Sequence, residues 1–206
     1  MFPLHHPVMT DDARLAGLRK LLSRHQPIRG PADPTLADAA VLLALRDADP
    51  LELLLIERAE KEGDPWSGHM ALPGGRRDPT DSDLLATALR ETREETGITV
   101  PPGAVLGGLD EVRPSARRRF SIVITPFVAG VPAETIAIPE PSEVETALWV
   151  PLSHLASADA VDEVLIDLEE ESRTFPALSY QDYVIWGLTH RIIMDFMGLA
   201  RQAGLV

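Results

Sequence analysis

ALPGGRRDPTDSDLLATALRETREETGI, residues 71–98, is the stretch that decides the fold. The run predicts the end of a strand, followed by a glycine loop, a helix and a glycine that stops the helix. Gly74 and Gly75 permit backbone conformations and close approaches that a side chain would block. We therefore expect the backbone at the glycine pair to lie against another group.

A helix follows the glycine loop. Thr80 or Asp81 is its expected cap, because short polar side chains accept hydrogen bonds from the first free backbone N–H groups. Gly97 is its expected end, since glycine adopts the left-handed conformation that stops many helices. Residues at helical spacing predict the face that anchors the helix to a core: Leu85, Ala88, Leu89 and Thr92.

Three carboxylates occupy the last two turns of this helix. Glu91 and Glu95 are four residues apart and lie one above the other, and Glu94 is one helical step to the side. At about 100° per residue, the three fall within roughly a third of the circumference. Arg90 is placed to pair with Glu94, but one guanidinium does not neutralise three carboxylates. Oxygen ligands of this kind suit Mg²⁺ or Mn²⁺.

Two interpretations of the acidic run compete. An isolated charge run usually marks a solvated helix face. A glycine loop at a fixed distance before the carboxylates favours the other interpretation, a diphosphate held by metal ions and backbone groups. We therefore predict that the three glutamates bind metal.

The segment resembles the Nudix box, a pattern of Gly, five residues, Glu, seven residues, then Arg-Glu-aliphatic-any-Glu-Glu-any-Gly-aliphatic. Its second half matches at Arg90, Glu91, Glu94, Glu95, Gly97 and Ile98. The first half departs from the pattern. Counting forward from Gly75 puts the first Glu at Asp81, whereas counting back from Arg90 puts it at Ser82. One residue is therefore extra, the first Glu is absent, and Thr92 occupies the aliphatic position.

Composition limits the class of protein. A chain of 206 residues fits one domain over residues 1–206 with a substantial core. A net charge of −13 argues against a nucleic-acid partner, but it is compatible with small phosphorylated substrates because bound metal inverts the local field. Without cysteine there is no disulfide framework and no thiol catalysis. No apolar run approaches the roughly 18 residues of a membrane span, and the N-terminus lacks the pattern of a secretory signal. A cytoplasmic location is the default expectation.

The segments outside the box predict two further helices and a sheet. Residues 10–25 have an amphipathic pattern and predict an accessory N-terminal helix. Residues 38–46 and 51–58 predict adjacent strands, the first of them central. Arg58, which ends the second strand, is either a surface ion-pair partner or a phosphate or base contact. Residues 180–203 predict a long apolar helix whose stripe is core or the seam of a homodimer.

Strand-like runs after the box flank a basic cluster. The runs are residues 104–112 and 120–131, and Arg113, Arg117, Arg118 and Arg119 lie between them. The cluster is either a solvated hairpin loop or a site for further phosphates, which guanidinium groups bind in bidentate fashion. Residues 164–178 predict a second hairpin.

Residues 132–143 are rich in proline and glutamate and predict a loop. Glu140, Glu143 or Glu145 could supply a further metal ligand or a base, as a downstream loop acid does in several Nudix enzymes. A solvated acidic loop is the alternative. Of the three, we assign Glu143 to the catalytic set.

Three further segments resemble the coenzyme A pyrophosphatase group of Nudix hydrolases: WSGHMALPGG at 66–75, TPFVAG at 125–130 and YVIWGLTHRI at 183–192. In that group threonines follow an upstream leucine pair and Phe precedes Pro-Gly-Gly. Here LLLIER and Leu72 stand in those places. The resemblance implies an α/β/α sandwich with a mixed central sheet, with an N-terminal helix and a long C-terminal helix added.

The resemblance also implies a function, the hydrolysis of a nucleoside diphosphate linked to another moiety. Glu91, Glu94 and Glu95 would hold Mg²⁺ or Mn²⁺ with a backbone carbonyl near Gly75, and Arg90 would orient them. One of the box glutamates or Glu143 would accept the proton of the attacking water. The residues expected to bind substrate are Gly74, Gly75, Arg58, Arg113 and Arg119.

Three functions stay open at this point. With coenzyme A or acyl-coenzyme A, the products would be 4′-phosphopantetheine and adenosine 3′,5′-bisphosphate. The missing upstream threonines favour a pyrophosphatase for ADP-ribose or dinucleoside polyphosphates. The missing first Glu favours a non-catalytic nucleotide-binding module, whereas the intact glutamates argue against it.

Overall fold

The computed structural model describes residues 13–31, 33, 35–61, 67–114, 122–167 and 172–206. Its helices are α1 (Ala13–Leu22), α2 (Leu84–Thr96), α3 (Leu152–Leu155) and α4 (Gly187–Gln202), with single 3-10 turns at Pro102–Ala104 and Ala158–Ala160. Its strands are β1 (Ala37–Arg46), β2 (Glu52–Arg58), β3 (Met70–Ala71), β4 (Gly74–Arg76), β5 (Val105–Gly108), β6 (Ile122–Val131), β7 (Val144–Pro151), β8 (Val161–Asp167), β9 (Ser172–Tyr180) and β10 (Tyr183–Trp186).

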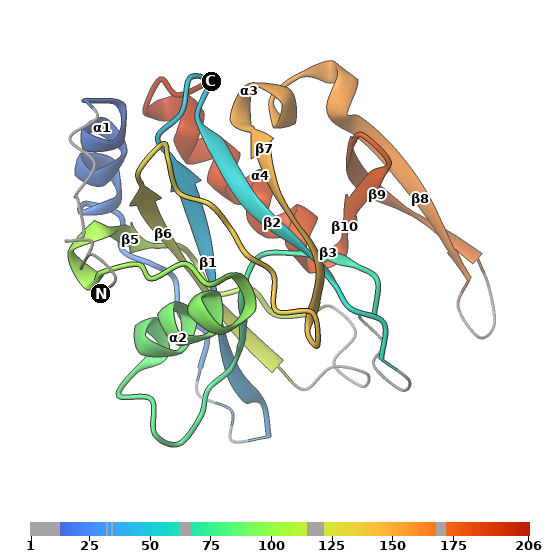
Figure 1. The fold of residues 1–206 in the computed structure, drawn as a ribbon, viewed down its shortest axis with the longest axis horizontal. Helices are drawn as coiled ribbons and strands as arrows, with labels where there is room; N and C mark the ends of the chain where they lie inside the picture. Colours follow the sequence, from blue (N-terminus) through green and yellow to red (C-terminus); the bar gives the residue numbers. More distant parts are fainter. Residues whose placement is uncertain (1–12, 32, 34, 62–66, 115–121, 168–171) are drawn as a thin grey trace, which may run out of the picture.

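A mixed sheet forms the middle of the molecule (Figure 1). Its strands run in the order β3-β2-β1-β6-β5, with β4 paired to β1 and β7 paired to β2. The strand β1 is central, as predicted. It runs parallel to β6 from Ala37↔Ile122 to Arg46↔Val131, and antiparallel to β2 and β4. Apolar side chains on both faces of β1 are buried, which is the pattern of a strand covered on both sides.

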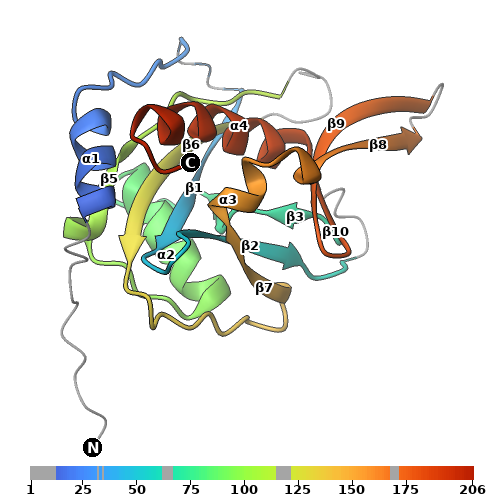
Figure 2. The same cartoon turned by 90° about the horizontal axis from the view of Figure 1, so that it is seen from above.

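Helices lie on both faces of this sheet, with α4 on one side and α2 on the other (Figure 2). Alternate residues of β1 point into two separate cores because side chains alternate along a strand. Leu43 and Leu45 join the core that includes α1 and α4, whereas Leu42 and Ala44 join the core that includes Ala88 of α2. The arrangement confirms the expected α/β/α sandwich with a mixed sheet.

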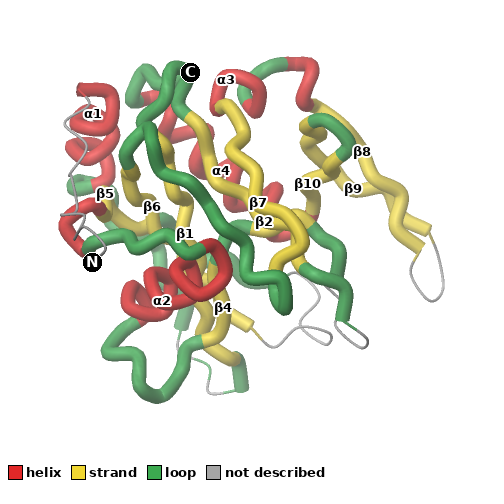
Figure 3. The backbone as a smooth tube through the Cα atoms, in the orientation of Figure 1, coloured by secondary structure: helices red, strands yellow, loops and turns green. Residues whose placement is uncertain are grey.

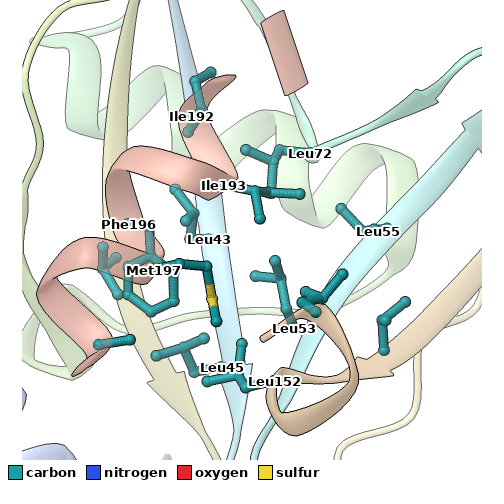
Figure 4. Packing of buried hydrophobic residues seen from close by; sticks show 14 of the residues in the cluster. Leu43, Leu45, Leu53, Leu55, Leu72, Leu152, Ile192, Ile193, Phe196 and Met197 are labelled. Carbon is teal, nitrogen blue, oxygen red and sulfur yellow. The ribbon is translucent and has the colours of Figure 1, made fainter. Parts of the chain in front are cut away.

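The apolar stripe of α4 belongs to the first core. Ile193, Phe196 and Met197 are fully buried and pack over Leu43 and Leu53 of the sheet (Figure 4). Of the two interpretations of this stripe, core packing is therefore the one observed. A homodimer stays a prediction.

A second, smaller sheet has the order β10-β9-β8. The strands β8 and β9 pair antiparallel from Val161↔Leu178 to Asp167↔Ser172, which confirms the hairpin predicted at 164–178. The hairpin projects away from the body of the molecule (Figure 3).

The prediction of one long helix over residues 180–203 was wrong at its start. Residues Tyr183–Trp186 form β10, which pairs with β9 from Tyr183↔Tyr180 to Trp186↔Ala177. The chain reverses at Gln181, whose φ is 54°, and the helix begins only at Gly187. The local pattern of this apolar run is also compatible with a helix. Pairing with β9 satisfies the hydrogen bonds of its backbone as a strand, so tertiary context overrides the local pattern.

The glycine pair is also placed differently from the prediction. Gly74 and Gly75 lie in the short strand β4, opposite Val41 and Ala40 of β1, and not in a loop. The predicted helix at 10–25 is present as α1 within the described residues. No helix in the described ranges has the length and apolarity to cross a membrane.

Candidate active site

Asp83, and not Thr80 or Asp81, caps the helix that carries the three glutamates. Its side chain accepts a 2.8 Å hydrogen bond from the backbone nitrogen of Ala86. The predicted cap was wrong because the polar turn before α2 offers several acceptors, and only the last of them directly precedes helical backbone. Gly97 ends the helix as predicted, in the left-handed conformation with φ 69°.

Small and polar residues form the buried face of α2: Thr87, Ala88, Thr92, Glu95 and Thr96. Thr92, at the aliphatic position of the box, donates its hydroxyl to the carbonyl of Ala88 at 2.7 Å. Its polar group is thus satisfied inside the helix. Leu85 and Leu89, expected on the anchoring face, are only half-buried. A face of small residues lets α2 lie close to β1 and β4.

Glu95 joins the acidic helix to the glycine pair. The residue is 3% exposed, and its Oε2 accepts a 2.8 Å hydrogen bond from the backbone nitrogen of Gly74. A Cβ at Gly74 would lie 2.3 Å from the carbonyl oxygen of Ala40, so only glycine fits there. Burial raises the pKa of Glu95 to about 8 and outweighs the hydrogen bond from Gly74, while the negative charge of Glu91 raises it further.

Glu91 lies against the second glycine. A Cβ on Gly75 would lie 2.5 Å from the carboxyl carbon of Glu91, so the missing side chain provides the space that this carboxylate occupies. Burial raises the pKa of Glu91, and the charge of Arg90 acts in the opposite direction. Glu91 and Glu95 are therefore two close, desolvated carboxylates facing the glycine strand.

Arg90 connects the acidic residues around it. Its Nη1 lies 2.9 Å from Oε1 of Glu91 and 2.8 Å from Oε2 of Glu94, the pair that the sequence predicted. Its Nε and Nη2 donate to the two oxygens of Asp81 at 3.0 and 2.9 Å. A guanidinium bound in bidentate fashion on one side and to two carboxylates on the other is fixed in position.

Asp81 is a residue whose role sequence reasoning missed. It is 8% exposed, and besides Arg90 it accepts hydrogen bonds of 2.9 Å from the hydroxyl of Thr87 and from the backbone nitrogen of Asp78. The hydrogen bonds from Arg90 hold the pKa of Asp81 well below its usual range. A signal for this role was present in the sequence. Counting forward from Gly75 along the box pattern places Asp81 at the position of the first Glu.

The loop 132–143 lies along the end of α2. The backbone nitrogens of Ile138 and Glu140 donate to the carbonyls of Thr96 and Glu95 at 2.8 and 3.0 Å. These bonds satisfy carbonyls that the last turn of a helix leaves free. The same loop carries Glu143, whose negative charge contributes to the raised pKa of Glu95. The charge of Glu143 also raises the pKa of Glu91.

The arginines expected to bind substrate differ in where they lie relative to the three glutamates. Arg58 ends β2, and its positive charge acts on Glu95, so it lies near the acidic group. Arg113 donates to the carbonyl of Pro31 at 2.9 Å and forms an ion pair of 3.5 Å with Glu111. Arg119, with Arg117 and Arg118, lies outside the described residues.

The structure thus brings together Arg90, the three box glutamates, the two glycines, Arg58 and Glu143. Within the described ranges, however, no three His, Cys, Asp or Glu side chains converge closely enough to form a preassembled metal site. The side chain of Glu94 is 43% exposed and pairs with Arg90 at 2.8 Å.

Comparison with known proteins identifies the family of the chain. The family model described as NUDIX domain matches residues 35–168. The mitochondrial coenzyme A diphosphatase NUDT8 of Homo sapiens is 33% identical over 164 residues, covering 78% of this chain and 67% of that protein. The uncharacterized Nudix hydrolase NudL of Photorhabdus laumondii is 32% identical over 183 residues, covering 87% and 95%. An uncharacterized Schizosaccharomyces pombe protein is 34% identical, and the chain spans 55% of its length.

Solved structures agree on the fold. A MutT/nudix family protein from Enterococcus faecalis superposes with a TM-score of 0.57 at 20% identity, covering 90% of this chain and 74% of that one. The NUDIX domain of Shewanella oneidensis NrtR, solved with ADP ribose, has a TM-score of 0.50 at 25% identity and covers 66% and 84%. The chain therefore belongs to the Nudix family, and it is a pyrophosphohydrolase that acts on small nucleotide substrates.

Proposed function

We propose that this protein hydrolyses the diphosphate bond of coenzyme A or acyl-coenzyme A with Mg²⁺ or Mn²⁺. One observation carries the chemistry: buried Glu95 bonds to the backbone of Gly74, with Glu91 beside it against Gly75. Two carboxylates meet the glycine strand there, and carboxylate oxygens are the ligands that Mg²⁺ prefers. The coenzyme A assignment is supported by the human relative and by the segments at 66–75, 125–130 and 183–192.

The residues present fit a divalent cation. Nudix hydrolases in general use such ions, and every side-chain donor in the acidic group is a carboxylate oxygen, the ligand that Mg²⁺ and Mn²⁺ prefer. Glu91, Glu94 and Glu95 would hold the ion together with a backbone carbonyl near Gly75. Burial raises the pKa of Glu91 and of Glu95, and a cation bound there would favour their ionised forms.

The proposed reaction adds water across the diphosphate. A divalent ion held by Glu91, Glu94 and Glu95 would neutralise the diphosphate and lower the pKa of water. The oxygen of water bonds to one phosphorus as the bond from that phosphorus to the bridging oxygen breaks. This yields 4′-phosphopantetheine and adenosine 3′,5′-bisphosphate. Glu143 is our candidate for the proton acceptor because it is exposed and its charge reaches Glu91 and Glu95.

The other residues of the site have positioning and binding roles in this proposal. Arg90 orients Glu91 and Glu94 and is itself fixed by Asp81. Gly74, Gly75 and Arg58 would contact the diphosphate. Arg113 and Arg119 stay candidates for a further phosphate contact, although part of the Arg113 guanidinium is engaged by Glu111 and Pro31.

A pyrophosphatase for ADP-ribose is the second candidate. It is favoured by the solved NUDIX domain with ADP ribose and by LLLIER and Leu72, which replace residues typical of the coenzyme A group. The non-catalytic alternative is disfavoured, because Asp81 supplies the carboxylate that the first half of the box lacked and thereby keeps Arg90 in place.

A substrate panel separates these candidates. The protein would be incubated with coenzyme A, acetyl-coenzyme A, ADP-ribose and diadenosine tetraphosphate, with Mg²⁺ or Mn²⁺, and the products identified by mass. We expect adenosine 3′,5′-bisphosphate from coenzyme A at the highest kcat/KM. Turnover of ADP-ribose with none of coenzyme A would refute the assignment.

A further inference from the structure

Two consecutive arginines follow the glycine pair and line a groove that the proposed chemistry does not use. Arg76 is the last residue of β4, and Arg77 follows it. The groove has a volume of about 340 Å³ and is lined by Ala37, Asp38, Arg76, Arg77, Asp78 and Pro79.

Arg76 has a fixed backbone and a free side chain. It pairs with Ala39 of β1, and its carbonyl accepts a 3.4 Å hydrogen bond from Arg90. Its side chain is exposed, and it makes no hydrogen bond or ion pair with any residue in the part of the chain that the structure describes. Its guanidinium is therefore not neutralised by an acid among the described residues.

Arg77 is held by neutral groups. Its Nη2 donates to the carbonyls of Asp81 and Ser82 at 3.1 and 3.2 Å, and its backbone nitrogen donates to the carbonyl of Asp38 at 2.9 Å. Carbonyl acceptors orient a guanidinium but leave its positive charge unneutralised. The two arginines therefore present two positive charges to one groove.

The groove also contains two acids, and neither cancels these charges through a direct contact. The Oδ1 of Asp78 accepts hydrogen bonds from the backbone nitrogen and hydroxyl of Thr80 at 2.8 and 2.7 Å. Across the described residues, no ion pair joins Asp38 or Asp78 to Arg76 or Arg77. The unpaired charge of Arg76 is thus available to an anion from solution.

We propose that this groove binds a phosphomonoester of the substrate nucleotide through Arg76, with Arg77 as a second contact. Arg76 follows Gly75 in β4, and its carbonyl accepts a hydrogen bond from Arg90, so the backbone at the edge of this groove contacts the acidic group. Guanidinium groups match phosphate in charge and geometry. Coenzyme A carries such a group as its 3′-phosphate, whereas dephospho-coenzyme A and ADP-ribose do not. The choice of coenzyme A as ligand rests on the proposed function.

Binding of the two possible nucleotide products tests the groove without catalysis. Adenosine 3′,5′-bisphosphate and AMP would be titrated calorimetrically into the whole protein in EDTA. We expect wild type to bind the bisphosphate at least about tenfold more tightly than AMP, since a charged hydrogen bond is worth that much. Arg76→Met should lose most of this preference, Arg76→Lys should retain part of it, and Arg201→Met, an exposed arginine on α4, should retain all of it. Equal affinities in wild type, or an unchanged preference in Arg76→Met, would overturn the proposal.

Kinetics separates failure of the groove from failure of the proposed function. Arg76→Met should lower kcat/KM for coenzyme A at least about fivefold more than for dephospho-coenzyme A. Equal losses on both substrates count against the groove while coenzyme A hydrolysis itself stands. A wild-type enzyme that leaves coenzyme A intact refutes the proposed function. In that case the calorimetric comparison of adenosine 3′,5′-bisphosphate with AMP alone tests whether the groove binds a phosphomonoester.

Discussion

The Oε2 atom of Glu95 lies 2.8 Å from the backbone nitrogen of Gly74. This contact joins the two halves of the box, the glycine strand β4 and the acidic helix α2. With Glu91 packed against Gly75, it places two carboxylates beside the glycine strand, that of Glu95 buried and that of Glu91 half-buried. Changes on either side of the contact are therefore expected to alter activity more than stability.

Glu95→Gln tests the carboxylate itself. The amide oxygen can still accept the hydrogen bond from Gly74, so we expect the fold to remain while kcat falls by orders of magnitude, about 10²-fold or more. Steady-state kinetics and circular dichroism melting would measure the two effects. Glu60→Gln, an exposed carboxylate beyond β2, is the control. Near wild-type turnover of Glu95→Gln would remove Glu95 from the catalytic set.

The stability of the metal-free protein should depend on the pH through Glu95. Its pKa is raised to about 8 in the folded protein, from 4.5 for an unperturbed glutamate, so folding favours the protonated form. The resulting stabilisation is full below pH 4.5 and is lost as the pH rises through about 8. The free energy of unfolding in EDTA should therefore fall with a slope of up to about 1.4 kcal/mol per pH unit over this range.

Denaturant unfolding at several pH values would measure this slope. Mg²⁺ should reduce it, because a cation favours the ionised carboxylate. Glu95→Gln should reduce it as well, since the titrating group is gone. If wild type and Glu95→Gln showed the same slope in EDTA, Glu95 would not be its source.

Gly75→Ala tests the space that the glycine provides. The new methyl would lie 2.5 Å from the carboxyl carbon of Glu91, so the carboxylate must move. Displacement of this size at a reacting centre costs about 10²-fold in rate, and we expect a loss of that order in kcat. Gly198→Ala in α4, where a Cβ meets no atom within 4 Å, should keep full activity and gain about 0.5–1 kcal/mol of stability. Equal activity of the two variants would exclude the steric explanation.

Asp81→Asn tests the support of Arg90. The variant keeps the size of the side chain but removes the charge that binds the guanidinium in bidentate fashion. We expect kcat to fall about tenfold or more while KM changes little, because Arg90 positions Glu91 without touching the substrate. Asp83→Ser, which preserves the helix cap, is the matched control. A larger effect on KM than on kcat would point to a different role for Asp81.

The sequence predicted the elements that local patterns control. The central strand, the acidic helix with its end at Gly97, the hairpin at 164–178 and the α/β/α class all follow from periodicity, from glycine placement or from the family resemblance. The pair between Arg90 and Glu94 followed from helical spacing.

Features that depend on tertiary contacts were missed. The run 183–186 joins a strand because β9 offers it a partner, and no local pattern reveals that. Asp81 was assigned as a cap, but the folded turn directs its carboxylate to Arg90, nine residues away. Arg76 and Arg77 were overlooked because a basic pair in a loop is usually solvated, and only the structure shows the groove beside them.

Mn²⁺ affinity tests most directly whether the acidic helix holds a catalytic metal. Free Mn²⁺ would be counted by electron paramagnetic resonance during titration of wild type, Glu95→Gln, and the Glu60→Gln control. We predict that wild type and Glu60→Gln bind Mn²⁺ alike and that Glu95→Gln binds it at least about tenfold more weakly. The same Mn²⁺ affinity in all three proteins would contradict a metal site on the glutamates of α2.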